Sequence, residues 1–118
     1  MKKILIVDDD SDLLFGLNAL LTNKGYEIRT LDEGGTAIPV IQEFHPDIIL
    51  LDVNLPGMDG RKICKLIKHN STTMHIPVIM ISANADRKDV TEVWEADDFM
   101  GKPFSLRSLY SKIETLIA

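Results

Sequence analysis

The 118-residue sequence has little cysteine and no long hydrophobic run. A single cysteine, Cys64, excludes an internal disulfide framework and fits a reducing compartment. The first apolar stretch, Ile4–Val7, stops at three aspartates and is far too short for a signal-peptide core or a membrane span. We therefore expect a cytoplasmic location without membrane contact.

The sequence is also poor in positive charge. Lys and Arg number 13 against 18 Asp and Glu, which gives a net charge of −5 at pH 7. Proteins hold phosphate backbones mainly with clustered Lys and Arg, so this balance argues against direct nucleic-acid binding. Neither a Walker-type phosphate loop nor a GxGxxG pattern occurs, so a nucleotide cradle is not indicated.

Short apolar runs alternate with amphipathic segments, which is typical of βαβ units in a parallel sheet. No repeat or linker divides the chain, and its length suits one domain, which we place at residues 1–118. Right-handed crossovers leave few topologies, and the flavodoxin-like strand order 2-1-3-4-5 is common at this size. We therefore predict an α/β fold, a three-layer α/β/α sandwich, with strands at Lys3–Val7, Tyr26–Thr30, Asp47–Leu51, Pro77–Ile81 and Asp98–Met100.

The predicted helices lie between and after these strands. Gly25 would end the first helix. The second would open at Gly34–Gly35 and run towards Phe44, although Pro39 removes a backbone donor and would bend or shorten it. The fourth is expected over Asp86–Glu95. The first, third and last helices have suitable N-caps, at Ser11, Asp59 and Ser105.

The third predicted helix carries the cysteine. Cys64 shares an apolar stripe with Ile63, Leu66 and Ile67, so we expect a small core residue rather than a nucleophile. The histidines lie beside loops without the spacing of metal ligands, so we expect surface roles for them. They are His45, His69 and His75.

Four of the apolar runs end in chemically distinctive residues. Asp8–Asp10 follow the first run and Asp52 ends the third, while Ser82 and Lys102 follow the fourth and fifth. Taken alone, Asp8–Asp10 could merely cap the first helix, where anions are favourable, and Lys102 could lie in a simple loop. Because parallel strands bring their carboxyl ends to one edge of a sheet, the four ends together favour a common pocket.

Three carboxylates, those of Asp8, Asp9 and Asp52, would lie within a few ångströms of one another. Two unit charges about 4 Å apart repel by roughly 4 kcal/mol at an effective dielectric near 20, so this group needs a cation or raised pKa values. Mg²⁺ is the simpler answer, because it prefers oxygen ligands and commonly binds carboxylates together with phosphate. Lys102 and Ser82 would contact such a phosphate, which outlines a phosphoryl site with an aspartate nucleophile.

The same segments resemble the receiver domain of response regulators in two-component systems. The similarity is carried by Ile4–Asp10, Leu50–Gly60, Ile81–Ala83 and Lys102–Phe104 and extends over essentially the whole chain. It implies a signalling phosphoprotein rather than an enzyme, which takes a phosphoryl group from a sensor histidine kinase or a phosphotransfer protein. It also implies that phosphorylation depends on Mg²⁺ and is reversed by autodephosphorylation.

The resemblance implies a role for each acidic residue of the site. Asp52 would be the phospho-acceptor and a metal ligand. Asp9 would bind Mg²⁺ directly and Asp8 through water, while the backbone carbonyl of Asn54 would complete the protein ligands. Asn54 and Asn84 would flank the site at positions associated with the hydrolysis rate in the family, and this polar pair gives no prediction of the phosphoryl lifetime.

The resemblance also implies how the signal leaves the site. Lys102 would pair with the phosphoryl group, and its bond to Pro103 is expected to be cis. Ser82 would follow the phosphoryl group by hydrogen bonding, and Phe99, in place of the commoner tyrosine, would turn inward as Ser82 moves. The fourth helix, fifth strand and last helix would then present the output surface to an effector that the sequence does not identify, or to a second copy in a phosphorylation-dependent homodimer.

One departure from the family pattern precedes the fifth strand. The common pattern is Glu-Ala-Gly-Ala-Asp-Asp, whereas this chain has Glu95-Ala96-Asp97-Asp98 and lacks the Gly-Ala pair. That glycine normally supplies the left-handed residue that ends the fourth helix, so we predict that the helix is shortened, displaced or frayed. Trp94 would either fill the resulting gap or belong to a partner surface.

Two other functions are alternatives to a switch controlled by phosphorylation. A receiver-like interaction module that works without phosphorylation is favoured only by the altered fourth helix. A hydrolase of small phosphomonoesters would need a second carboxylate in an Asp-x-Asp motif, and Asp52-Val53-Asn54 lacks it. The complete set of site residues favours the phosphorylated switch.

Overall fold

A computed structural model describes residues 1–83 and 89–117 of the chain. Its strands form one sheet in the order β2-β1-β3-β4-β5, in which every neighbouring pair is parallel. The predicted α/β class and strand order are therefore confirmed. The strands are β1 (Lys3–Val7), β2 (Glu27–Leu31), β3 (Ile48–Asp52), β4 (Val78–Ser82) and β5 (Asp98–Gly101).

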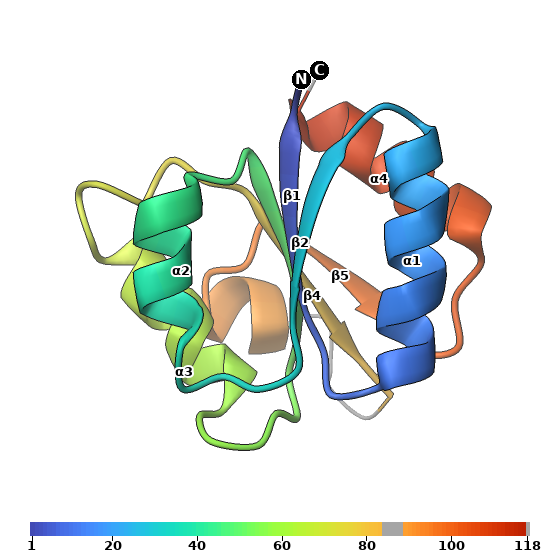
Figure 1. The fold of residues 1–118 in the computed structure, drawn as a ribbon. Helices are drawn as coiled ribbons and strands as arrows, with labels where there is room; N and C mark the ends of the chain where they lie inside the picture. Colours follow the sequence, from blue (N-terminus) through green and yellow to red (C-terminus); the bar gives the residue numbers. More distant parts are fainter. Residues whose placement is uncertain (84–88, 118) are drawn as a thin grey trace.

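Helices cover both faces of the sheet and complete the predicted three layers (Figure 1). Within the described ranges, no helix is both long and apolar enough to cross a membrane. One face carries α1 (Ser11–Asn23) and α4 (Leu106–Ile117), and the other carries α2 (Ala37–Phe44), α3 (Gly60–Lys68) and a short π-helix, η1 (Asp89–Val93).

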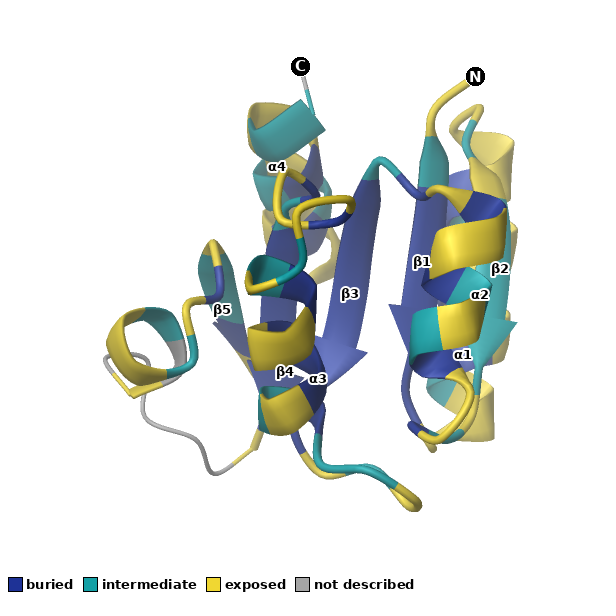
Figure 2. Ribbon diagram, turned by 90° about the vertical axis from the view of Figure 1, so that its left-hand side faces the viewer, coloured by how far each residue is buried: buried dark blue, intermediate teal, exposed yellow. Residues whose placement is uncertain are grey.

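The central strands are buried on both faces, as expected for a parallel sheet between helices (Figure 2). Successive residues of a strand point to opposite faces. In β1, Ile4 and Ile6 therefore pack with α1 and α4, whereas Leu5 and Val7 pack with α2 and α3. This double burial fixes the ends of the strands, and with them the residues that follow.

The N-cap of α1 is Asp10, which corrects the prediction of Ser11. The Asp10 Oδ1 accepts hydrogen bonds from the N–H groups of Asp12 and Leu13 at 3.1 and 3.2 Å. Because this carboxylate already caps the helix, Ser11 becomes its first residue. The end of α1 is as predicted, since Gly25 follows it with φ of 98°, a conformation that favours glycine.

Three strands, β2, β3 and β4, begin and end one residue later than predicted. β3 extends to Asp52 because this residue still pairs with Ile81 of β4. β2 begins at Glu27 because the Tyr26 N–H donates to the Leu21 carbonyl, which is the last contact of the turn after α1. The shift holds Asp52 inside the sheet rather than in the loop that follows.

The second helix begins at Ala37, which corrects the predicted start at Gly34–Gly35. The Glu33 carboxylate accepts hydrogen bonds from the N–H groups of Gly35 and Thr36, so the chain makes a turn first. Pro39 then lies in the first helical turn, where N–H groups have no partner within the helix. The proline therefore coincides with a shortened helix and does not interrupt it.

The helices α3 and α4 begin at the predicted caps. Asp59 and Ser105 each accept a hydrogen bond from a backbone N–H of the first turn, at 2.8 and 3.0 Å. Cys64 is fully buried in α3, as expected of a core residue, and burial raises the pKa of its thiol to about 12. Leu66 does not belong to the buried stripe, since it is 50% exposed.

The segment before β5 departs from the predicted helix over Asp86–Glu95. Its described part contains the π-helix Asp89–Val93, and Glu95 follows with φ of 67°. The glutamate thus adopts the left-handed conformation that the missing glycine would have supplied. The helical element ends at Val93, two residues before the predicted end, which agrees with the predicted shortening at this end. Residues 84–88, which include Asn84, lie outside the described residues.

Candidate functional site

The predicted site residues meet at the carboxyl edge of the sheet. Asp8 follows β1, while Asp52 and Ser82 are the last residues of β3 and β4. Ser82 is in register with Gly101, the last residue of β5, so Lys102 leaves the sheet beside it. Figure 2 shows the strands side by side, with their arrowheads pointing to this edge. The predicted pocket is formed by residues that are distant in sequence and close in space.

Three carboxylates form the acidic centre of the site. One oxygen each of Asp8, Asp9 and Asp52 lies within 4.8 Å of the other two. Asp8 and Asp52 are buried, whereas Asp9 is exposed, so the cluster is open to solvent on the side of Asp9. Such an arrangement of oxygen ligands is able to hold a divalent cation.

Lys102 supplies a positive charge beside two of these carboxylates. Its Nζ lies 2.9 Å from Asp8 Oδ2 and 3.6 Å from Asp52 Oδ2. Burial lowers the pKa of Lys102, but its interactions with Asp8 and Asp52 outweigh this effect and raise the pKa above its usual value. The lysine is therefore a permanent cation in the site.

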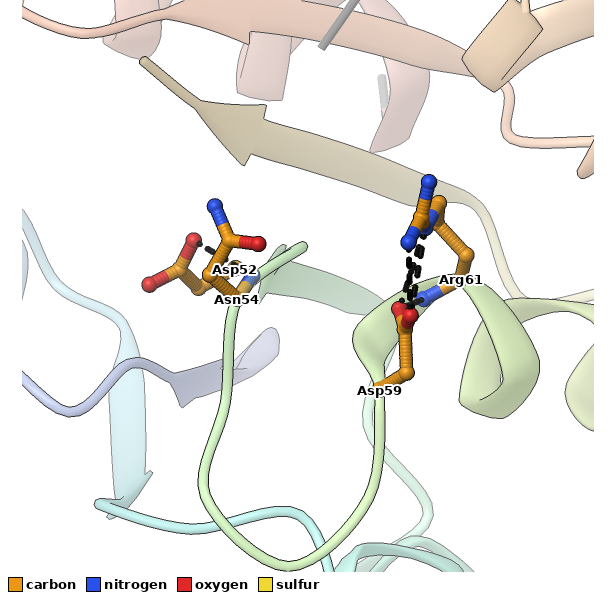
Figure 3. A network of polar contacts seen from close by, with 4 residues as sticks. All are labelled: Asp52, Asn54, Asp59 and Arg61. Atoms are coloured by element: carbon orange, nitrogen blue, oxygen red, sulfur yellow. Dashed lines mark hydrogen bonds and ion pairs between the residues drawn. The ribbon is translucent and has the colours of Figure 1, made fainter. Parts of the chain in front are cut away.

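The surroundings of Asp52 raise its pKa. Burial and, next, the charge of Asp8 raise its pKa to about 6, against the opposing charge of Lys102. One oxygen of Asp52 is held by the backbone, because its Oδ1 accepts the Asn54 N–H at 3.2 Å (Figure 3). A bound cation would offset the repulsion that contributes to this raised pKa.

The backbone around Asp8 leaves one oxygen available to a ligand. Its Oδ1 accepts the Asp10 N–H at 2.9 Å. Its buried Oδ2 pairs with Lys102 but accepts no well-directed hydrogen bond from the described residues. A buried oxygen in this state fits a metal-bound water or a metal. The donor set of the site is therefore compatible with Mg²⁺.

Ser82 and Phe99, the two residues predicted to act as a switch, lie on the neighbouring strands β4 and β5. Ser82 is buried, and its carbonyl accepts the Lys102 N–H at 3.0 Å. Phe99 is half-buried and packs against the core on the α2 and α3 face. The Lys102–Pro103 peptide bond is cis, which confirms that prediction.

Sequence reasoning missed the residues that meet Trp94. The cationic groups of Arg61 and Lys65, one turn apart on α3, lie over the Trp94 ring at 5.5 and 5.7 Å from its centre. This placement agrees with the packing role considered for Trp94. The i, i+4 spacing of two cations on one helix was the available signal, but nothing in the sequence indicated which ring they contact.

Fold and site together define a flavodoxin-like domain with an acidic, lysine-bearing pocket at a topological switch point. A family model described as the response regulator receiver domain matches residues 4–114. The chain therefore belongs to the response regulator receiver family.

Individual relatives agree with this assignment. The response regulator PleD of Caulobacter vibrioides is 41% identical over 116 residues, which are 97% of this chain and 26% of PleD. The DNA-binding response regulator MtrA of Mycobacterium tuberculosis is 34% identical over 114 residues, 95% of this chain and 49% of MtrA. The structure of the Vibrio cholerae chemotaxis protein CheY4 superposes with a TM-score of 0.89 at 27% identity and covers 98% of each chain. The chain thus spans at most about half of the two curated relatives.

Proposed function

We propose that this receiver domain accepts a phosphoryl group on Asp52 from a histidine kinase or a phosphotransfer protein, in the cytoplasm, and that Mg²⁺ is required. The observation that carries the proposal is the position of Asp52, buried within 4.8 Å of two other carboxylates and 3.6 Å from Lys102. In this setting the Asp52 carboxylate can act as a nucleophile, because Lys102 lies on one side and the carboxylates that could bind a metal lie on the other.

The proposed transfer is a displacement at phosphorus. An Asp52 oxygen forms a bond to phosphorus while the bond from phosphorus to the donor nitrogen breaks, and the electron pair of that bond stays on the donor histidine. Asp52 Oδ1 is engaged with the Asn54 N–H, which leaves Oδ2, on the Lys102 side, as the attacking oxygen. Lys102 then neutralises part of the charge on the phosphoryl oxygens.

Asp9, Asp52 and the Asn54 carbonyl are the residues proposed to hold Mg²⁺, with Asp8 acting through water. The ion would supply positive charge to the phosphoryl oxygens during transfer. The exposed position of Asp9 and the buried, incompletely bonded oxygen of Asp8 support this division of roles. Hydrolysis of the acyl phosphate at the same site would return the domain to its starting state.

The proposed output follows from Ser82 and Phe99. A phosphoryl oxygen would attract the Ser82 hydroxyl, and Phe99 would turn further inward as Ser82 moves. Both residues belong to strands next to η1 and α4, so the switched surface comprises η1, β5 and α4. A downstream effector, or a second copy of the chain, would bind the surface in its switched state.

Intact-mass measurement tests the proposal. The protein is incubated with a small acyl-phosphate donor, with and without Mg²⁺, and Asp52→Asn is treated in parallel. A single phosphate that requires Mg²⁺ and is absent from the variant is expected. If the folded wild type gains no phosphate from a donor that modifies another receiver domain, the irregular π-helix η1 would instead favour a phosphorylation-independent interaction module.

A further inference from the structure

The segment between η1 and β5 is held against α3 by aromatic and charged contacts. At one end, Trp94 lies beneath two cations of α3, Arg61 and Lys65, whose charged groups are 5.5 and 5.7 Å from the ring centre. Trp94 is half-buried and the contact is favourable because a ring face attracts cations. The position of the segment therefore depends on where α3 places these side chains.

The other end of the segment is anchored more firmly. Lys68 Nζ pairs with Asp97 Oδ2 at 2.6 Å, and the same oxygen accepts the Val78 N–H of β4 at 2.7 Å. Between the two ends, His69 pairs with the carboxylate of Glu95, the residue with positive φ. Asp97 is thus fixed to the sheet. The backbone N–H of Trp94 bonds to the Asp89 carbonyl of η1, whereas its side chain meets the two cations of α3.

Arg61 is coupled in turn to the backbone at Asp52. Its Nη2 lies 2.8 Å from Asp59 Oδ2, and its Nε lies 3.2 Å from Asp59 Oδ1. The Gly60 N–H donates to the Val53 carbonyl at 2.9 Å, and a Cβ on Gly60 would lie only 1.9 Å from the Asp52 carbonyl oxygen. The start of α3 is therefore packed directly on the acceptor residue, and Figure 3 shows Asp52 and the Asp59–Arg61 pair at the two ends of one loop.

We propose that these contacts form a conformational relay, in which phosphorylation of Asp52 loosens Trp94 from Arg61. In the present state, the Asn54 N–H bonds to Asp52 Oδ1 at 3.2 Å. Formation of the acyl phosphate turns Asp52 Oδ1 from a charged carboxylate oxygen into a neutral carbonyl oxygen and places the negative charge on the phosphoryl oxygens. The loop from Asn54 to Asp59 therefore takes a different arrangement. Movement of Asp59 carries Arg61 away from the ring. The inference rests on the proposed acceptance of a phosphoryl group by Asp52.

The relay would reach the output surface by a route separate from Ser82 and Phe99. Trp94 leads through Asp97 into β5, which begins at Asp98. A change at Trp94 therefore acts on the entry to β5 from the α3 side, whereas the change at Ser82 acts on Phe99 through the sheet. The two routes converge on one strand, which gives phosphorylation two points of control over the same surface.

Fluorescence of Trp94 tests the relay without a label, because the chain has one tryptophan. Acrylamide quenching is measured before and after phosphorylation with a small acyl-phosphate donor and Mg²⁺, and the extent of modification is measured by intact mass on the same samples. We expect the ratio of accessible to protected tryptophan to rise about two- to fivefold. This factor corresponds to the free energy that an exposed cation–π contact contributes. Asp52→Asn should show no rise.

Variants at two arginines separate the relay from general effects. Arg61→Gln should make Trp94 accessible before phosphorylation and abolish the further rise, with the phosphate adduct still formed. Arg61→Lys, which retains the cation, should restore part of the response. Arg107→Gln changes an exposed arginine on α4, on the opposite face of the sheet, and should behave as wild type.

The outcomes distinguish failure of the relay from failure of the proposed function. If phosphate is added and the quenching of Trp94 stays unchanged, the relay is wrong and phosphoryl acceptance stands. An unaltered response in Arg61→Gln likewise overturns the relay. If no phosphate is added under any condition, the proposed function is wrong and the relay falls with it.

Discussion

Lys102 is closer to Asp8 than to Asp52, with its Nζ 2.9 Å from an oxygen of the first and 3.6 Å from an oxygen of the second. In the state described, the lysine therefore neutralises Asp8, which is proposed to bind Mg²⁺ through water, more than Asp52, the proposed phospho-acceptor. A bound cation and the lysine compete for the same negative charge. Phosphorylation would give the lysine a new partner.

Replacement of Lys102 tests this competition. Without the ammonium group, Lys102→Gln should bind Mg²⁺ about tenfold more tightly, because one nearby positive charge no longer opposes the ion. The same variant should respond less to phosphorylation, since the phosphoryl group loses its cationic partner. Calorimetric titration with Mg²⁺ measures the first effect. The change in acrylamide quenching of Trp94 on phosphorylation measures the second. Lys112→Gln, at a lysine paired with Asp98 instead, is the matched control. Weaker Mg²⁺ binding by Lys102→Gln would contradict the assignment.

The raised pKa of Asp52 predicts a pH dependence of stability in the absence of divalent metal. The folded protein holds this proton up to about pH 6, whereas the unfolded chain releases it near the usual pKa of 3.8. Protonation therefore favours the folded state, and this contribution is lost as pH rises from about 4 through 6. The free energy of unfolding of wild type, relative to Asp52→Asn, should fall over that range.

Urea unfolding in the presence of a chelator measures this difference at several pH values. The comparison with Asp52→Asn removes the contribution of every other titrating group that the two proteins share. Saturating Mg²⁺ should abolish the decline, because a cation stabilises the ionised carboxylate. A wild-type stability that rises relative to the variant between pH 4 and 6 would show that Asp52 does not carry a raised pKa.

The positions of the candidate site residues could be predicted from the sequence because these residues stand at the ends of apolar runs. A parallel sheet buried on both faces leaves little freedom in register, so Asp52, Ser82 and Lys102 had to meet at one edge. Ser11 was predicted as the cap of α1 although Asp10 is, because the two neighbouring residues are both suitable and tertiary placement decides between them.

The contacts of Trp94 were beyond sequence reasoning for a different reason. The missing Gly-Ala pair indicated an irregular segment, but nothing local determines where such a segment packs. Its placement depends on Arg61 and Lys65 of α3 and on the pairing of Asp97 with Lys68, which are long-range contacts. Irregular segments lack the periodicity from which the strands were predicted.

Gly60 should be irreplaceable by alanine, because the start of α3 packs on the backbone of Asp52. An added Cβ would lie 1.9 Å from the Asp52 carbonyl oxygen, a contact that forces backbone movement. We expect Gly60→Ala to lower the free energy of unfolding by about 3 kcal/mol, although alanine is the better helix former. Impaired phosphorylation should accompany this loss, because the movement displaces Asp52.

Gly16 provides the control for this substitution. It lies in the exposed middle of α1, where a Cβ would meet no atom of the described residues within 4 Å. Gly16→Ala should therefore raise the free energy of unfolding by about 0.5–1 kcal/mol, the ordinary difference in helix propensity. Chemical denaturation of both variants gives the comparison. Equal effects at the two positions would be inconsistent with close packing at Gly60.

Glu95 should be improved by glycine, because it holds the left-handed conformation that the family pattern assigns to a glycine. Its φ of 67° costs a non-glycine residue about 1–2 kcal/mol. The substitution also removes the pair with His69, whose two side chains are 59% and 43% exposed. A side-chain pair this exposed contributes at most about 1 kcal/mol, so Glu95→Gly should still stabilise the protein slightly.

A double-mutant comparison separates strain at Glu95 from the lost pair. In a His69→Ala background the contact between the two side chains is already absent, so Glu95→Gly should show its full gain of about 1 kcal/mol there. Glu92→Gly is the matched control, because Glu92 is exposed in η1 and has no positive φ. This substitution should lower the free energy of unfolding. Urea midpoints of the single and double variants provide the measurement. If Glu95→Gly destabilises the protein in both backgrounds, the backbone at this position is not strained, and the missing Gly-Ala pair has been accommodated without cost.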